Sequence, residues 1–327
     1  MKLIRSASGL AAAFAIAASA VLSTPLIAQE RVFLGIATGG TGGTYYPLGG
    51  MLAQLISNTA QVEGKKLIAT AETGNASVAN AGLLARKEIE TAFIAADILD
   101  AAFKGKNQFD GKAAPNIRAL GSLYPETVQL VSRKAAAIGS FADIKGKSVS
   151  SGSPGSGQWQ LLGDLLKVHG FARTDVKEDL SSFAQSADKI KDGNLDSSLI
   201  TAGIPTASIT ELANGHDVVI VPLTGPQIAE LQKVQPYYAN ATLPANTYRG
   251  QTSDVPTIAV RAIWATHADL DDKVAYALVK ALYENTETLG KVHVMGKQIS
   301  LQTALESISV PLHPGAERYF REKGILK

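Results

Sequence analysis

Two glycine-rich segments carry the residue types best suited to holding a small anion. They are residues 38–47 (TGGTGGTYYP) and 151–157 (SGSPGSG), and each stands between a predicted strand and a predicted helix. Glycines let the backbone turn tightly and leave its N–H groups uncovered, and a helix N-terminus carries a partial positive charge. Both segments are therefore predicted to bind an anion. The alternatives are a flexible connecting loop at the first segment and a plain helix cap at Ser156 in the second.

The spacing in these segments excludes common nucleotide and hydrolase motifs. The first segment has no Gly-Lys-Ser/Thr ending, and Tyr45 stands where a dinucleotide fingerprint needs its third glycine. Neither Ser153 nor Ser156 has a glycine two residues before it, as a nucleophile elbow requires. The five histidines lack ligand spacing, and there is no cysteine, so we expect no metal, no cofactor and no disulfide.

Two shorter segments also follow predicted strands. They are residues 72–77 (ETGNAS) and 201–205 (TAGIP). Asn75 and Ser77 either cap the next helix or reach a ligand.

The elements that must position these loops alternate along the first third of the chain. Strands are predicted at 32–38, 66–71 and 91–96, with helices at 45–60 and 77–88. This β-α-β-α-β order is typical of a parallel sheet with helices on its faces. Ligands bind such sheets beyond the carboxyl ends of the strands, which is where the loops above lie.

A second α/β unit follows a break in the alternation. Strands 117–124 and 127–133 are consecutive, which we interpret as a crossing between two lobes. Strand 147–151, helix 157–169 and strands 195–201 and 217–221 come next, then a loop-like stretch at 236–257, a returning strand at 257–265 and helices at 271–288 and 315–323. We therefore expect two lobes that close on a ligand by a hinge near 122–128 and 222–250.

Residues 1–28 resemble a secretory signal peptide. Lys2 and Arg5 precede an uncharged apolar run at 9–22, and Ala28 follows a proline break. The full chain has 31 Lys plus Arg and 29 Asp plus Glu, so removing this segment leaves equal numbers of each sign. A neutral mature chain gives no electrostatic reason to bind nucleic acid. A soluble, monomeric periplasmic protein is expected.

The motifs together resemble the TAXI family, the solute-binding components of one class of TRAP transporters. The motifs are GIATGGTGGTYYPLGG (35–50), ETGNASVANAGLL (72–84), LGSLYPE (120–126), DIKGKSVSSGSPGSG (143–157), KDGNLDSSLITAGIP (191–205), LPANTYRGQTSDVPT (243–257) and PLHPGAERYFREKG (311–324). The chain departs from the family at Ala95-Ala96-Asp97, where relatives usually carry Gln-Ser-Asp.

The resemblance implies a two-lobed type II periplasmic-binding-protein fold of the α/β class. The implied lobes are residues 29–123 with 250–327, and residues 124–249. The implied function is capture of a small carboxylate, such as glutamate, glutamine or 2-oxoglutarate, and its delivery to an ion-coupled TRAP permease. The implied ligand-binding residues are Gly42, Thr44, Tyr45, Asn75, Ser77, Tyr124, Ser153, Gly155, Ser156, Gly157, Thr201, Gly203 and Pro205.

Two other function classes remain as alternatives to this non-enzymatic receptor. An enzyme on a related two-lobed fold would turn over a bound solute, although the sequence offers no nucleophile, metal set or cofactor loop. If the protein served in signalling or adhesion, we would expect no permease genes next to the gene that encodes it.

Overall fold

The computed structural model describes residues 30–327. The predicted signal peptide at residues 1–28 lies outside the described residues. Within the described part of the chain, no helix has the length and apolar character needed to cross a membrane.

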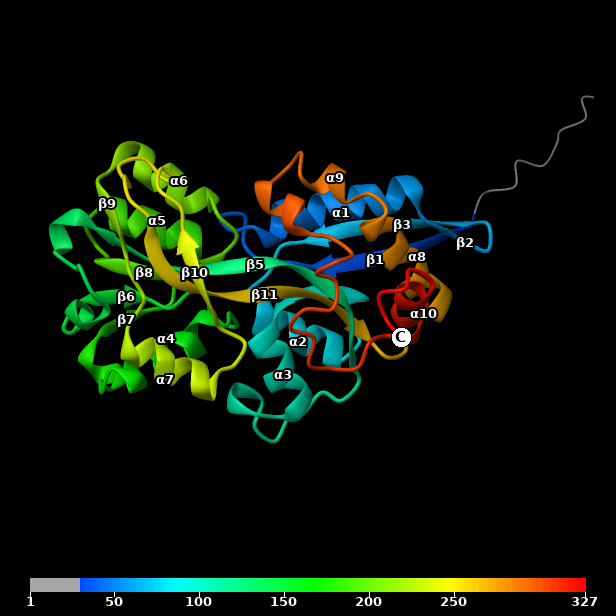
Figure 1. The fold of residues 1–327 in the computed structure, drawn as a ribbon, viewed down its shortest axis with the longest axis horizontal. Coiled ribbons are helices and arrows are strands. Elements are labelled where there is room, and N and C mark those ends of the chain that lie inside the picture. The colour runs from blue at the N-terminus through cyan, green and yellow to red at the C-terminus, as the bar shows by residue number, and fades with distance from the viewer. Residues whose placement is uncertain (1–29) are drawn as a thin grey trace, which may run out of the picture.

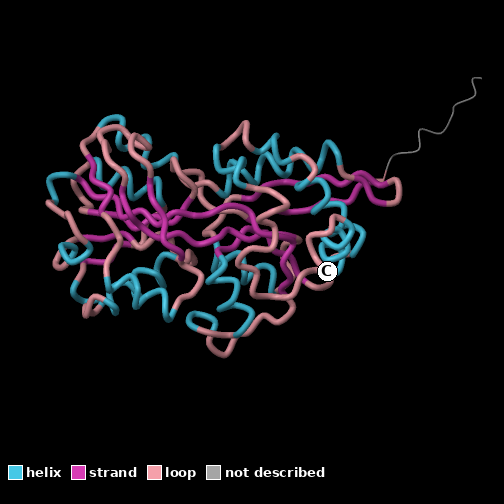
Figure 2. Tube along the Cα trace, in the orientation of Figure 1, coloured by secondary structure: helices cyan, strands magenta, loops and turns pink. Residues whose placement is uncertain are grey.

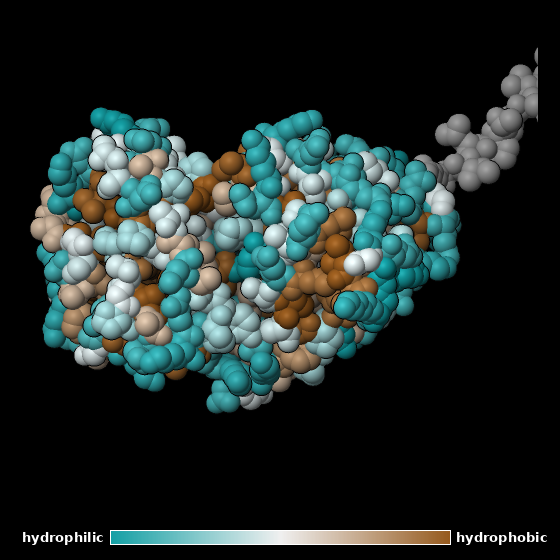
Figure 3. Space-filling view, viewed as in Figure 1, coloured by the Kyte–Doolittle hydropathy of each residue, from teal (hydrophilic) through white to brown (hydrophobic). Residues whose placement is uncertain are grey.

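One mixed sheet runs along the long axis of the molecule (Figure 2). Its strand order is β2-β3-β1-β4-β11-β5-β8-β6-β7, with β10 paired to β11 and β9 paired to β5. The long strands β5 (Ile117–Arg133) and β11 (Val255–His267) pair with each other and extend into both halves of the molecule. These two strands connect two lobes. The outline of the molecule is notched between the lobes in Figure 3.

Lobe 1 contains the amino- and carboxyl-terminal parts of the described chain (Figure 1). Its strands are β1 (Arg31–Ala37), β2 (Gln61–Val62), β3 (Lys65–Glu72) and β4 (Thr91–Ala95). Its helices are α1 (Tyr45–Thr59), α2 (Ser77–Ala85), α3 (Ala96–Lys104), α8 (Asp272–Tyr283), α9 (Thr286–Leu289) and α10 (Pro314–Glu322). β1 pairs in parallel with β3 and β4, as the alternating pattern predicts.

Lobe 2 contains the middle of the chain. Its strands are β6 (Ser148–Ser150), β7 (Lys177–Asp179), β8 (Ser197–Ala202), β9 (Val218–Val221) and β10 (Ala239–Leu243). Its helices are α4 (Gln158–Val168), α5 (Phe183–Lys191), α6 (Ala207–Gly215) and α7 (Pro226–Val234). β6 pairs in parallel with β7 and β8.

Apolar side chains fill both faces of the sheet. On one face a single core extends through both lobes and includes Ile94 under α2 and α3 and Leu161 and Leu165 of α4. On the other face each lobe has its own core, under α1 and α8 in lobe 1 and under α5 and α6 in lobe 2. Removal of this apolar surface from water is the main force that holds the layers together.

Some predicted elements differ from the structure in type or extent. The predicted strands 117–124 and 127–133 form one strand of 17 residues, because β11 pairs with it on both sides of Pro125. The stretch at 236–257, predicted to be a loop, contains β10 and the start of β11, since long-range pairing between those two strands has no local sequence signal. The predicted helix 271–288 ends as α8 at Tyr283, and α9 begins at Thr286.

Candidate ligand-binding cleft

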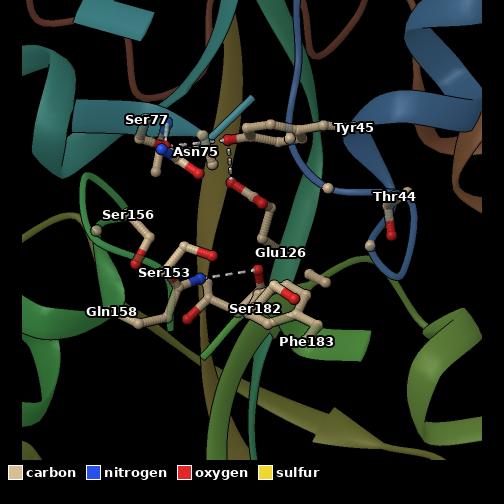
Figure 4. Close-up of a pocket in the computed structure, with 18 of the residues that line it drawn as sticks. Thr44, Tyr45, Asn75, Ser77, Glu126, Ser153, Ser156, Gln158, Ser182 and Phe183 are labelled. Carbon is tan, nitrogen blue, oxygen red and sulfur yellow. Dashed lines mark hydrogen bonds between the residues drawn. The ribbon is translucent and has the colours of Figure 1, made fainter. Parts of the chain in front are cut away.

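A cleft with an empty volume of about 910 Å³, part of it open to solvent, lies where the two lobes meet. It is bordered by loops at the carboxyl ends of β1, β3 and β4 in lobe 1 and of β6, β7 and β8 in lobe 2. Figure 4 shows the labelled side chains around it. Among the predicted ligand-binding residues, the following line the cleft: Gly42, Thr44, Tyr45, Asn75, Ser77, Ser153, Ser156, Gly157 and Thr201.

The first glycine-rich loop leads directly into α1. Thr44 is the N-cap of this helix, but no side chain accepts a hydrogen bond from its first turn within the described structure. The Thr44 hydroxyl instead donates to the carbonyl of Gly203 over 3.2 Å. A Cβ on Gly42 would lie 3.1 Å from the backbone nitrogen of Ala184, so this position has little room for a side chain. The backbone of the loop is therefore the surface that borders the cleft.

The helix α2 begins at the same cleft. Its N-cap is Ala76, which has φ 63° and ψ −147°, a backbone conformation that ordinarily requires glycine. Neither Asn75 nor Ser77 caps the helix, and the Ser77 hydroxyl accepts a 3.0 Å hydrogen bond from the backbone nitrogen of Ala95. Asn75 is exposed and borders the cleft. The capping alternative for these two residues is therefore not what the structure shows.

The second glycine-rich loop leads into α4 in lobe 2. The N-cap of α4 is Gly157, and the described residues supply no side-chain cap. Ser156 precedes this position, is 7% exposed, and donates a long hydrogen bond of 3.5 Å to the carbonyl of Ser151. Ser156 is therefore not the plain helix cap considered from the sequence. α1, α2 and α4 all begin at one cleft without a side-chain partner for their first amides.

Direct contacts hold the two lobes closed around the cleft. The backbone nitrogen of Ala79 in lobe 1 donates to the carbonyl of Gly155 over 3.0 Å. The backbone nitrogen of Ser208 in lobe 2 donates to the carbonyl of Gly42 over 3.1 Å. Gly155 and Gly203 therefore lie at contacts between lobes and do not line the cleft.

Two further predicted residues also lie outside the lining. Tyr124 is fully buried in the core of lobe 1, packed under α1 and α8. Pro205 is exposed, and its carbonyl is 3.0 Å from the Nε2 of His293 in lobe 1. Pro205 thus takes part in the contact between lobes.

Two carboxyl groups that the sequence analysis did not single out as site residues lie in the cleft. Glu126 is 4% exposed, and its Oε2 accepts a 2.8 Å hydrogen bond from the Tyr45 hydroxyl. Burial, together with the nearby Asp97 carboxylate, raises the pKa of Glu126 to about 8. Asp97 Oδ2 accepts a 2.8 Å hydrogen bond from Tyr238, and burial raises the pKa of Asp97 to about 6. The cleft therefore combines uncapped helix N-termini with an acidic floor.

Other side chains at the cleft come from positions without a local motif. Gln158, Ser182 and Phe183 border it in lobe 2. Gln158 donates to the carbonyl of Thr201 over 3.5 Å, while its Oε1 is buried without a partner. The available signal for Glu126 was a single acidic residue between predicted strands 117–124 and 127–133, and for Asp97 it was its position directly after strand 91–96.

The described residues contain no cluster of His, Cys, Asp and Glu side chains that could hold a metal ion. The chemistry of the cleft is therefore that of backbone amides, hydroxyls, amide side chains and two carboxyl groups.

Residues 36–324 match the model of the NMT1-like family. Among the solved structures that resemble the chain is a protein of Bordetella bronchiseptica RB50, at 14% identity and a TM-score of 0.52 over 88% of each chain. Another is the alkanesulfonate-binding protein SsuA of Xanthomonas axonopodis pv. citri, at 14% identity and a TM-score of 0.50 over 91% of this chain and 95% of that one. A third is the periplasmic aliphatic sulphonate binding protein SsuA of Escherichia coli, at 15% identity and a TM-score of 0.49 over 89% and 83%. The predicted fold class is confirmed.

Proposed function

The chain belongs to the NMT1-like family, and from that membership and the geometry of the cleft we propose that it is an extracytoplasmic receptor for a small carboxylate. The observation that carries this proposal is the convergence of three helix starts on one cleft. α1 and α2 approach from lobe 1 and α4 from lobe 2, each without a side-chain cap within the described structure. A ligand that binds these amides is held by both lobes at once.

A carboxylate is the ligand group that these helix starts favour. Each helix N-terminus attracts a negative charge by roughly 0.3–1 kcal/mol, and by up to about 2 kcal/mol where the site is partly buried. Hydrogen bonds from amides to a charged acceptor contribute about 1.5–3 kcal/mol each. The sequence resemblance to the TAXI family suggests glutamate, glutamine or a 2-oxoglutarate-like acid as the first ligands to test.

The receptor is proposed to act outside the cytoplasm and without converting its ligand. The signal-like pattern at residues 1–28 supports export to the periplasm. The sequence resemblance supports delivery to an ion-coupled TRAP permease. The lobes, which we place at 29–123 with 250–327 and at 124–249, would close and open about β5 and β11. Permease genes next to the gene for this protein would support the partnership, and their absence would favour signalling.

A thermal-shift screen of the purified protein tests the proposal. The panel contains amino acids, mono- and dicarboxylates, organosulfonates, sugars and simple cations. A ligand present at about 100 times its Kd should stabilise the protein by about 2.7 kcal/mol. The proposal expects a carboxylate to give this shift and to be recovered unchanged by mass spectrometry. Stabilisation by sugars or cations alone would refute the proposal that the ligand is a carboxylate. Chemical conversion of the ligand would show that the protein is an enzyme.

A further inference from the structure

Two acidic residues, Glu126 and Asp97, line the cleft. Glu126 comes from the middle of β5, where the chain passes between lobes, and Asp97 comes from the first turn of α3. Each accepts a hydrogen bond from one tyrosine, Tyr45 or Tyr238. Asp97 Oδ1 is buried and has no hydrogen-bond partner in the structure. Buried carboxyl groups with so few partners are costly unless a cation or another donor reaches them.

No basic side chain of the described residues lines this cleft. The side chains that act electrostatically on the two carboxyls from the surrounding elements are acidic or phenolic, while the backbone amides of Asp97 and Ile98 at the start of α3 lower the pKa of Asp97. These side chains are Tyr45 of α1, Tyr124 of β5, Tyr238 before β10 and Asp164 of α4. Arg261 of β11 is engaged elsewhere, because it donates to the Ser122 hydroxyl and forms an ion pair with Glu306. The protein itself therefore supplies no cation to Glu126 or Asp97.

We infer that the ligand supplies the missing cation, and that the receptor selects a zwitterionic amino acid whose ammonium group binds at Glu126. This inference rests on the proposed function, because the ligand carboxylate occupies the amides at the starts of α1, α2 and α4. The ammonium then lies over the acidic floor, where Glu126 faces the cleft beside Tyr45 (Figure 4). A dicarboxylate without an amino group would add two negative charges to a cleft that already contains two acids and no base.

Matched ligand pairs that differ only in the amino group test the inference by calorimetry. The pairs are L-glutamine with glutaric acid monoamide, L-glutamate with glutarate, and L-leucine with 4-methylpentanoate. The wild-type protein should bind the amino acid of at least one pair at least tenfold more tightly than its partner. Equal or tighter binding of the deaminated acids would overturn the inference and leave the proposed function standing. If only acids without an amino group stabilise the protein in the thermal-shift screen, the inference fails and the proposed function stands.

The Glu126→Gln variant tests whether Glu126 is the residue that recognises the amino group of the ligand. This change keeps the shape of the side chain and removes its charge, so the preference for the amino acid should fall by at least tenfold. Glu306→Gln is the matched control, because Glu306 pairs with Arg261 outside the cleft and is half exposed. Its ligand preference should equal that of the wild type. A thermal scan of each variant confirms that it is folded, and an unchanged preference in a folded Glu126→Gln variant would overturn the role of Glu126.

The pH dependence of the ligand affinity shows whether the Glu126 carboxyl group pairs with the ligand ammonium or donates a hydrogen bond to the ligand carboxylate. If Glu126 pairs with an ammonium, binding releases its proton, so the affinity for the amino acid should rise from pH 6 to pH 8. If instead a protonated Glu126 donates to the ligand carboxylate, the affinity should stay nearly constant up to about pH 7 and begin to fall only near pH 8, where the pKa of Glu126 lies. Proton release measured at about pH 7 by calorimetry in buffers of different ionisation enthalpy supports the inference, and binding without proton release contradicts it.

Discussion

Tyr45 and Glu126, which both line the cleft, are joined by a 2.8 Å hydrogen bond with the phenolic hydroxyl as donor and Oε2 as acceptor. Tyr45 is the first residue of α1, and Glu126 lies in the strand that connects the two lobes. Both side chains are at least 94% buried. The bond therefore ties the start of a ligand-facing helix to the acidic group beneath it.

Tyr45→Phe should reduce the stability of the empty protein by about 1–3 kcal/mol, because it leaves the buried Glu126 carboxyl without its donor. It should also weaken amino acid binding, since the start of α1 loses its tie to the floor of the cleft. Chemical denaturation and calorimetry measure the two effects. Tyr46→Phe is the control on the next residue, which does not line the cleft. Equal effects of the two changes would contradict the role of the Tyr45 hydroxyl.

Glu126 should make the empty protein less stable as the pH rises. Burial raises the pKa of Glu126 to about 8 from the ordinary value of 4.5 for a glutamate side chain. Between these values the unfolded chain loses this proton while the folded protein keeps it, so stability falls by up to about 1.4 kcal/mol per pH unit. Glu126→Gln should remove that slope. Asp97→Asn should flatten only the part below about pH 6, where the pKa of Asp97 lies. Parallel curves for wild type and Glu126→Gln from pH 5 to 8 would disprove the raised pKa.

Ser156→Asp should weaken binding by at least tenfold, because it places a negative charge at the amides that receive the ligand carboxylate. Ser156→Asn has nearly the same shape without the charge and serves as the control. It should change the affinity by only a few-fold, since the backbone donors remain. Calorimetry with the strongest ligand from the screen compares them. Wild-type affinity in the Asp variant would place the carboxylate away from α4.

Ala76→Gly should stabilise the protein by about 1 kcal/mol. A non-glycine residue at the φ of 63° and ψ of −147° found here costs of order 1–3 kcal/mol, and the added entropy of glycine in the unfolded chain offsets about 0.5–1 kcal/mol of the gain. Ala277→Gly, in the middle of α8, is the comparison and should destabilise by about 1 kcal/mol. Denaturant titration gives both values, and a loss of stability in Ala76→Gly would show that the Ala76 backbone is not strained.

Ligand binding should bring α1 and α6 closer together. The chain has no cysteine, so dyes can be attached at Gln54→Cys on α1 and Glu211→Cys on α6, two exposed positions on different lobes. The hydrogen bonds from Ala79 to Gly155 and from Ser208 to Gly42 should form on closure. Energy transfer between the dyes should therefore increase with ligand. No change on saturation would mean that the lobes do not close on the ligand about β5 and β11.

The sequence predicted the location of the cleft because strand periodicity fixes where loops lie. Parallel strands place their carboxyl ends at one edge, so the loops that contain Gly42 and Asn75 had to meet, and so did those around Ser156 and Thr201. The predicted crossing strands connect the two lobes, so the loops of one lobe were expected to face the loops of the other across one cleft. The contribution of Gly155 and Gly203 to lobe contacts was not predictable, because their partners lie on the other lobe.

The acidic floor was not predictable because it depends on distant contacts. Tyr45 and Glu126 are 81 residues apart in sequence, and Asp97 and Tyr238 are 141 residues apart. A single sequence gives the residue types at these positions, but it does not show which phenol meets which carboxyl group. The departure at Ala95-Ala96-Asp97 is visible in the sequence, but the hydrogen bond from Tyr238 to Asp97 is not.

The most direct test of the central claim is a crystal structure of the protein with the strongest stabilising ligand from the thermal-shift screen. The account predicts that the ligand carboxylate accepts hydrogen bonds from backbone amides at the starts of α1, α2 or α4, and that its ammonium nitrogen lies within hydrogen-bond distance of Glu126. A ligand that binds outside this cleft, or whose carboxylate contacts none of these amides, would contradict it.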